Sequence, residues 1–488
     1  MGFAFDLEIG RIFDVSGLMR RILIFFLLVG GTVVPTTAQE LALKKGVIMD
    51  SLPVNDSIAR RIILYLPQDF DTGKQWPVLF LCDMEGEQSK KIRYLKTAAD
   101  KNGYIIATTR GLKDSLSLTN KILLISKTLD ELKDLLPLDS ERIYTMGYDT
   151  GGQLATIVPS MLRGVSGVLS VASSLPNLEL INPKDPFDFV GVMGRGDYQY
   201  VYLLGSEVLL DQRKVPNYIF YHPEGHQWPD LVYLDLGIQM LTLMGMKRAT
   251  VPRDDSVIQS AYTDYQNVIL ELEQMGQWGL GYHYSEQGES VFKALTDTDW
   301  FRDKKKSIRK SKEYKDQKRE WDAVRLKELV LDGDYMFYLE EDVLSFNLDN
   351  LGWWNYQMGK ITKYKNSAKR EEQLLGERLD GYLNALIDEY LVLSAQEPNP
   401  DYDGLILLNM LKTITAPADY EHYLQVISLT AKYGDFGTSN YYLEALLKKG
   451  YADADKLYTL PHTGLLRISP EYNALIAQYL GEARYAVE

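Results

Sequence analysis

The stretch GYDTGG, residues 147–152, has the spacing of a turn that exposes one reactive side chain. A strand that enters Gly-x-nucleophile-x-Gly and continues as a helix forces the middle residue into a strained turn, and glycines are needed where the chain crowds itself. Residues 142–146 have the composition of a strand, and the residues from Gln153 onward have that of a helix. A serine usually occupies the middle position, but here it is Asp149. The pattern therefore predicts an exposed reactive position that carries a carboxylate.

Two further residues follow in the chain order that such a site requires, which is nucleophile, acid, histidine. Asp197 comes directly after the β-rich run 188–196, and His226 lies on a Gly-flanked loop after the run 217–221. A histidine on such a loop takes either charge state near neutral pH. Asp149, Asp197 and His226 are therefore the candidate catalytic residues, whereas His222 is expected to pack within its own strand.

The residues from 57 to about 248 alternate short β-rich runs with helix-compatible segments. The runs are nearly continuously apolar, which suits strands that are covered on both faces. This alternation predicts a mostly parallel sheet, in which reactive groups collect at the carboxyl ends of the strands. The predicted strands are 60–66, 76–82, 104–109, 141–148, 167–173, 188–193 and 217–221; the predicted helices lie around 88–102, 120–136, 151–163, 205–214 and 230–246.

From about residue 254 the pattern is amphipathic and helical, with Tyr and Leu recurring at helical spacing. We interpret these stripes as core packing between helices. Several helix pairs end on Gly followed by Tyr or Asp, which resembles a tetratricopeptide-like repeat, although no strict 34-residue period fits. The charge run 302–320 predicts a solvated helix or a connector. The expected organisation is an α/β domain over 39–253 and an all-helical, repeat-like domain over 254–488.

The segments LYLPQDFDTGKQWPVLFL, GYDTGGQLA, GRGDYQY and GHQWP carry a resemblance to a known family. Residues 57 to about 248 resemble the α/β-hydrolase fold, and specifically the secreted esterases that include polyhydroxyalkanoate depolymerase and feruloyl esterase relatives. The resemblance implies that His226 is a general base, that Asp197 is its orienting acid and that Asp149 stands at the nucleophile position. The ligand is left open between a small molecule and an ester-like compound.

Two positions depart from the esterase pattern. Asp149 replaces the serine, and LCDMEGEQ stands where the family usually has a His-Gly turn that donates a backbone N–H to the oxyanion. The remaining candidates for oxyanion donors are the backbone N–H groups of Thr150 and Asp83. The carboxylates of Asp83 and Glu85 would oppose stabilisation of negative charge. They predict an acidic mouth that favours proton uptake or, with less weight, a bound cation.

The chemistry of Asp149 leaves two functions open. Attack on an ester would give a mixed anhydride, and its tetrahedral intermediate expels the carboxylate more readily than the alkoxide, so esterase turnover should be lost. The first function is therefore an impaired esterase whose helical region supports binding or scaffolding, with a protein partner. The second is an active hydrolase in which Asp149 attacks a saturated carbon and His226, oriented by Asp197, activates water against the resulting ester.

Length and charge narrow the classes of protein further. A chain of 488 residues exceeds what a single core normally serves, so at least two domains are expected. A net charge of −14 argues against a nucleic-acid partner. The sequence contains no HExxH motif, no clustered histidines and no paired cysteines, and we expect neither a metal nor a cofactor.

Residues 1–38 are predicted to be a signal peptide with an over-extended start. Arg20 and Arg21 precede an apolar run, and small residues come before Gln39. The run is short for a membrane span, so the mature chain is expected to have no transmembrane anchor. An exported protein usually pairs its cysteines or avoids them, and this chain has only Cys82. The expected location is extracytoplasmic, either periplasmic or secreted.

Overall fold

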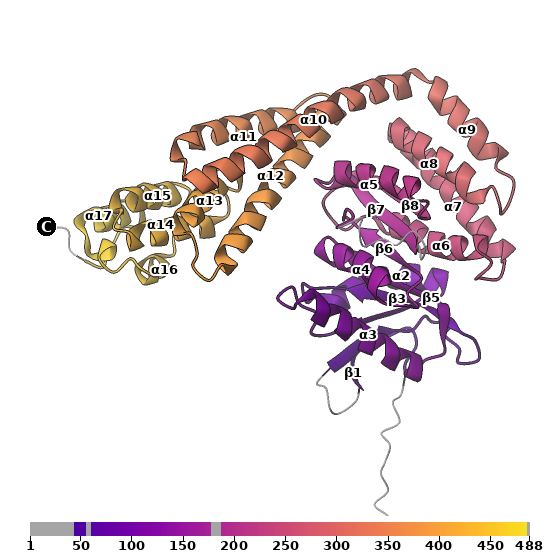
Figure 1. Cartoon of the computed structure of the whole chain (residues 1–488). Helices are drawn as coiled ribbons and strands as arrows, with labels where there is room; N and C mark the ends of the chain where they lie inside the picture. Colours follow the sequence, from indigo (N-terminus) through magenta and orange to yellow (C-terminus); the bar gives the residue numbers. More distant parts are fainter. Residues whose placement is uncertain (1–42, 55–59, 177–186, 486–488) are drawn as a thin grey trace, which may run out of the picture. The chain divides into compact units, whose positions relative to one another are not determined.

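The computed structural model describes residues 43–54, 60–176 and 187–485 (Figure 1). The predicted signal peptide lies outside the described residues. From Lys45 onward the described residues form one compact unit. Among them, no helix combines the length and the apolar composition that crossing a membrane requires.

An eight-stranded sheet forms the first part of this unit, in the order β1-β2-β4-β3-β5-β6-β7-β8. β1 and β2 pair antiparallel, as do β2 and β4, whereas the pairs from β4 through β8 are parallel. All side chains of β3, β4, β6 and β7 are buried, which explains their continuously apolar sequences. The strands are β1 (Ile48–Val54), β2 (Arg60–Tyr65), β3 (Trp76–Cys82), β4 (Ile105–Thr109), β5 (Leu138–Tyr148), β6 (Gly167–Val171), β7 (Asp188–Gly196) and β8 (Asn217–Gly225).

The predicted mostly parallel sheet is confirmed, and seven of its strands lie where the sequence placed them. The sequence did not predict β1, because its residues IMDSLPV mix polar side chains with a proline. Such a composition suits an edge strand, and β1 pairs only with β2.

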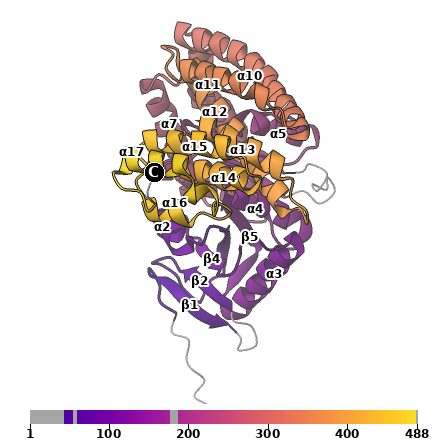
Figure 2. The same ribbon diagram turned by 90° about the vertical axis from the view of Figure 1, so that its left-hand side faces the viewer.

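Four helices, α2 to α5, connect strands, α6 follows the last strand, and helices cover the sheet on both faces. Figure 2 shows α2 and α3 on opposite sides of the sheet. α5 begins at Tyr200, five residues before the predicted start, because Tyr200, Val201 and Leu203 are buried. The helices are α2 (Gln88–Asn102), α3 (Leu118–Leu135), α4 (Thr150–Met161), α5 (Tyr200–Gln212) and α6 (Leu231–Lys247).

All described elements after α6 are helices. α6, which follows the last strand, ends at Lys247, and the first helix of the C-terminal region, α7, begins at Asp255. The division into domains at 253/254 stays a prediction. The charge run 302–320 is helical, with one break at Ser311, whose hydroxyl caps the next helix. The helices are α7 (Asp255–Gln274), α8 (Trp278–Phe292), α9 (Asp299–Lys310), α10 (Lys312–Ser345), α11 (Leu351–Lys365), α12 (Arg370–Gln396), α13 (Tyr402–Thr415), α14 (Tyr420–Lys432), α15 (Phe436–Lys448), α16 (Ala454–Thr459) and α17 (Pro470–Leu480).

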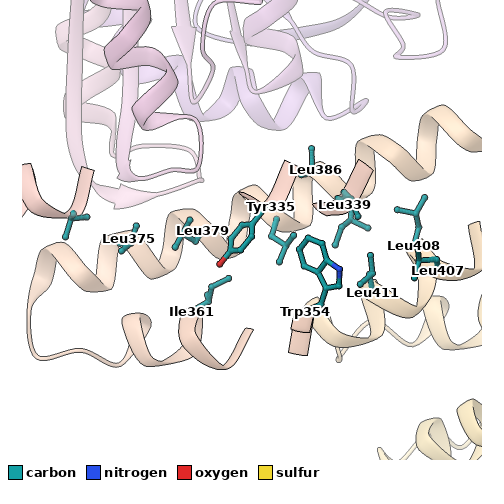
Figure 3. Packing of buried hydrophobic residues seen from close by; sticks show 13 residues of the cluster. Tyr335, Leu339, Trp354, Ile361, Leu375, Leu379, Leu386, Leu407, Leu408 and Leu411 are labelled. Atoms are coloured by element: carbon teal, nitrogen blue, oxygen red, sulfur yellow. The ribbon is translucent and has the colours of Figure 1, made fainter. Parts of the chain in front are cut away.

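Apolar side chains from α10, α11, α12 and α13 form one buried cluster, which includes Tyr335, Trp354, Leu379 and Leu408 (Figure 3). The Trp354 indole N–H donates to the Asp342 carboxylate at 2.7 Å, so its polar atom is satisfied inside the core. A second cluster occupies the helices from α14 to α17. The interpretation of the Tyr and Leu stripes as helix–helix core is therefore confirmed.

Buried ion pairs join α12 to the carboxyl end of β7. Arg378 donates from Nε and Nη2 to the two carboxylate oxygens of Glu328 on α10, both at 2.6 Å. Its third contact, from Nη1, reaches the carbonyl oxygen of Arg195 at 2.7 Å. Arg195 in turn pairs with Glu371 on α12 at 2.7 Å. These four side chains are at most 4% exposed, so the helical region is fixed to the strand end from which Asp197 projects.

Replacing Arg378 with alanine is expected to destabilise the protein by about 3–5 kcal/mol, because it leaves the buried Glu328 carboxylate without its partner. The matched control is Lys365→Ala on α11. It removes a half-exposed ion pair with Asp380 of α12, the helix that carries Arg378. The control should cost less than about 1 kcal/mol. Urea denaturation of both variants measures the difference, and equal costs would contradict the anchoring role assigned to Arg378.

Candidate functional site

Asp149 occupies a strained turn between β5 and α4. Its backbone angles are φ 50° and ψ −120°, a conformation that non-glycine residues rarely adopt. The neighbouring glycines are required by close contacts. A Cβ on Gly147 would collide with the carbonyl of Gly151, and a Cβ on Gly151 would collide with the carbonyl of Cys82 at the end of β3. The fold therefore contains the strained turn that the GYDTGG pattern predicts.

The structure brings Asp149, Asp197 and His226 together at the carboxyl ends of β5, β7 and β8. His226 Nδ1 lies 2.8 Å from Asp197 Oδ2, which is a hydrogen bond. On the other side of the ring, Nε2 lies 3.9 Å from Asp149 Oδ1, within ion-pair range but beyond a hydrogen bond. Asp197 is fully buried, whereas the side chains of Asp149 and His226 are 25% and 30% exposed. The histidine thus stands between two carboxylates, one of which is open to ligand.

Two residues that the sequence analysis did not select also hold the Asp149 carboxylate. Gln199 Nε2 donates to Asp149 Oδ1 at 3.1 Å, and the Tyr198 hydroxyl donates to the same oxygen at 3.4 Å. The Gln199 side chain is fixed from its other end, since Oε1 accepts from the backbone N–H of Ser174 at 2.8 Å. Both residues follow Asp197 directly in the sequence, and that adjacency was the only signal that could have indicated them.

The protonation states follow from burial and from these partners. Burial is the main cause that raises the pKa of Asp149, opposed by the positive charge of His226 and by a backbone hydrogen bond from Thr150. Burial alone would lower the pKa of His226. The hydrogen bond that His226 donates to Asp197 and the charges of Asp197 and Asp149 outweigh that effect, so the pKa of His226 is raised. A raised pKa favours the imidazolium, which is not a base.

The loop after β3 carries Asp83 and Glu85, and one of their two negative charges is compensated. Lys91 on α2 pairs with Asp83 and, at 2.8 Å, with Glu85. Asp83 also accepts from the backbone N–H of Gly86 at 3.1 Å. The expected acidic mouth is therefore only partly present, because a lysine that the sequence analysis overlooked, eight residues after Asp83, neutralises it.

The two predicted oxyanion donors lie next to the turn. Thr150 begins α4, so its backbone N–H is at a helix N-terminus, and Asp83 directly follows the last residue of β3. The Thr150 N–H is one of the groups that lower the pKa of the Asp149 carboxyl. The role of either backbone group in catalysis stays a prediction.

Aromatic rings surround the imidazole of His226. The rings of Tyr148 and Tyr198 lie 5.4 and 4.9 Å from it, centre to centre. Trp228, from the GHQWP segment, stacks on Tyr148 at 5.3 Å. Gly381 of α12 packs against Tyr198, since a Cβ at that glycine would lie 3.2 Å from Tyr198 Cβ. The helical region therefore contacts a residue that touches both Asp149 and His226.

Other candidate groups lie away from this site or are inert. His222 is buried inside β8, as expected, and burial lowers its pKa to about 4. Cys82 is buried, and burial raises the pKa of its thiol. Within the described part of the chain, no group of three or more His, Cys, Asp or Glu side chains is arranged to hold a metal ion.

No protein-family model matches the chain, and no curated protein matches its sequence. Among solved structures, S-formylglutathione hydrolase (FrmB) from Staphylococcus aureus is 16% identical, with a TM-score of 0.33; the match covers 42% of this chain and 99% of that one. Est1E from Butyrivibrio proteoclasticus is 11% identical, with a TM-score of 0.32 and coverages of 42% and 99%. An esterase from Rhizomucor miehei is 12% identical, with a TM-score of 0.35 and coverages of 48% and 92%.

These identities and scores are low, so the role of each residue in this chain rests on its own geometry. The sheet order, the strained turn and the positions of Asp197 and His226 agree with the resemblance found in the sequence. By its sheet order, its strained turn and the placement of Asp197 and His226, the chain has an α/β fold that resembles the α/β-hydrolases, followed by an all-helical C-terminal region.

Gly147→Ala should destabilise the protein by more than about 3 kcal/mol, because the new Cβ collides with backbone that cannot move away. Gly333→Ala is the matched control, since it lies inside α10 with no atom within 4 Å of the added Cβ. That change should stabilise the protein by about 0.5–1 kcal/mol. Thermal unfolding compares the two, and a tolerated Gly147→Ala would show that the turn is not constrained as described.

Asp197→Asn should lower the pKa of His226, because it removes the charge that offsets burial. The raised pKa of His226 contributes stability that is fully present below its unfolded-state pKa and is lost as the pH rises through the folded-state pKa. The variant should therefore lose stability mainly on the acidic side. Histidine ring signals followed by NMR across pH measure the pKa, with His422 as an internal reference; an unchanged His226 titration would refute the assignment.

Proposed function

We propose that this protein is an exported α/β-hydrolase-like protein that is impaired in ester hydrolysis and acts by binding. The observation that supports the proposal most strongly is the environment of the Asp149 carboxylate. Gln199 and Tyr198 donate to it, and His226 lies beside it. A carboxylate held in that position by the protein's own donors supplies no hydroxyl for attack on an ester.

The chemistry of acyl transfer leads to the same conclusion. Attack of Asp149 on an ester would form a tetrahedral intermediate with two leaving groups, a carboxylate and an alkoxide. The carboxylate is the better leaving group, so the intermediate returns to the starting ester. The raised pKa of His226 further reduces the fraction of neutral imidazole able to act as a base.

Binding is the role that the remaining features support. The site keeps an aromatic rim of Tyr148, Tyr198 and Trp228 around partly exposed Asp149 and His226. The helical region packs against this rim at Gly381 and is anchored to the strand end through Arg378. We propose that the ligand is a small, ester-like molecule and that the helices provide the surface for a protein partner. The proposal that the protein is exported is based on the signal peptide predicted over residues 1–38.

A second function is supported by one specific observation, the 3.9 Å separation of Asp149 Oδ1 and His226 Nε2. Asp149 would attack a saturated carbon, forming an alkyl ester while a halide leaves or an epoxide ring opens. The opened epoxide oxygen would take a proton from Tyr198. Water activated by neutral His226 would then hydrolyse the ester and regenerate the Asp149 carboxylate.

The first experiment compares aryl-acetate hydrolysis by the wild type and by Asp149→Ser, both starting at Gln39. Wild type is expected to show no turnover above that of His226→Gln. The turnover of Asp149→Ser should exceed that of wild type by about 10²-fold, which is the lower end of the contribution of a positioned general base. Asp149→Asn is the matched control, because it removes the charge without supplying a nucleophile. Turnover by wild type at an ordinary enzymatic rate would overturn the proposal.

The second function has its own test. His226→Gln blocks the hydrolytic step, so an alkyl ester formed on Asp149 should accumulate when the variant is incubated with an alkyl bromide or with styrene oxide. Intact-protein mass spectrometry detects the addition, and peptide mapping locates it. Modification of His226→Gln that is absent from the double variant with Asp149→Asn would establish the second function. An unmodified protein would exclude these two substrates and favour the binding role.

A further inference from the structure

A cavity of about 180 Å³ lies away from the Asp149 site, between the sheet and the helices that follow it. Tyr200 of α5 and Tyr221 of β8 line it from the sheet side. Tyr282 of α8, together with Tyr314 and Trp321 of α10, lines it from the helical side. Figure 1 shows α8 beside α5 and β8. Two parts of the fold that are distant in sequence thus build one aromatic-walled space.

The aromatic rings that line the cavity contact one another. Tyr282 stacks on Tyr314 with ring centres 4.8 Å apart and an interplanar angle of 27°. Tyr200 meets Tyr221 edge to face at 5.2 Å, and His283 meets Tyr221 in the same way at 5.1 Å. Such pairs hold each other in fixed orientations, so the wall offers both faces and edges of rings to a ligand.

The charged side chains among the described lining of the cavity are Arg195 and Lys318. A carboxylate lies directly behind the wall, since Glu207 accepts from the Tyr221 hydroxyl at 3.0 Å. Arg195 is 4% exposed and pairs with Glu371, while its Nη1 reaches Gln277 only at the hydrogen-bond limit of 3.5 Å. Lys318 is half-exposed and pairs with Asp322 at the surface. Arg195 and Lys318 each have a carboxylate partner outside the lining, and the long contact of Arg195 Nη1 to Gln277 leaves this nitrogen able to donate to an anionic or strongly accepting group.

Size limits the ligand. An apolar cavity of about 150 Å³ accommodates benzene. A space of about 180 Å³ therefore admits one six-membered ring with a small substituent. We propose that this cavity binds a single-ring aromatic carboxylate, with the ring among the tyrosines and Trp321 and the carboxylate toward Arg195. The cavity does not depend on the function of Asp149, although two of its lining residues, Arg195 and Tyr200, flank the segment 197–199 at the Asp149 site.

Benzoate is the probe that tests the site, and Trp321 in the wall supplies a fluorescence readout. The full mature chain should bind benzoate saturably, with benzylamine about tenfold weaker or more because its charge opposes those of Arg195 and Lys318. Cyclohexanecarboxylate should also bind more weakly, since it lacks the ring faces that stack on tyrosine. Titration calorimetry gives the affinities independently of fluorescence. Equal affinity for benzoate and benzylamine, or no saturable binding, would overturn the proposal.

Two variants with opposite effects on volume locate the binding. Leu204→Trp fills the cavity from the α5 side, and Tyr282→Ala removes one stacked ring. Each should weaken benzoate binding at least about tenfold. Tyr441→Ala, which removes a 67% exposed ring from α15, is the matched control and should bind like wild type. Circular dichroism confirms folding, and a folded Leu204→Trp protein that still binds benzoate normally would refute the location.

Benzoate binding in the cavity can be tested separately from the function of Asp149, Asp197 and His226. Asp149→Ser and His226→Gln should bind benzoate with the affinity of wild type, because neither residue lines the cavity. Loss of benzoate binding in both variants, with the fold intact, would place the benzoate at the Asp149 site and contradict this inference. The same result would leave the proposed loss of ester hydrolysis untouched.

Discussion

The strained turn at Asp149 is the constraint on which the site depends. A residue at φ 50° and ψ −120° persists only where the surroundings leave no alternative. Here β3, β5 and α4 approach so closely that Gly147 and Gly151 admit no side chain. The turn directs the Asp149 carboxylate toward His226 and places the N-terminus of α4 beneath it.

Charge balance decides what that carboxylate can do. His226 lies between Asp149 and Asp197, so the cluster of one imidazole and two carboxylates favours a proton on the ring. In the loop after β3, Lys91 pairs with both Asp83 and Glu85 and compensates one of their two negative charges. Most charged groups of the site therefore have a partner within the protein.

The helical region is joined to the sheet by charges that would be costly if left unpaired. Arg378 and Arg195 are buried with Glu328 and Glu371, and the carbonyl oxygen of Arg195 completes the network. Breaking one member leaves an uncompensated charge in a medium that solvates it poorly. This geometry fixes the segment that follows β7, which carries Asp197, Tyr198 and Gln199. The position of the acid and the orientation of α12 are therefore set together.

The sequence by itself determined the parallel sheet, the strained turn and the residues Asp149, Asp197 and His226, because local periodicity, glycine spacing and chain order encode them. It did not reveal β1, whose polar residues lack a strand's alternation and whose place at the edge comes from pairing with β2. Nor did it reveal Lys91, Tyr198, Gln199 or Arg378 as neighbours of the site. Only the tertiary structure decided those, since hydrogen bonds and ion pairs between separate elements depend on where the elements pack. The aromatic cavity could not be predicted from the sequence either, because its walls come from segments up to some 120 residues apart, and no local sequence pattern links them.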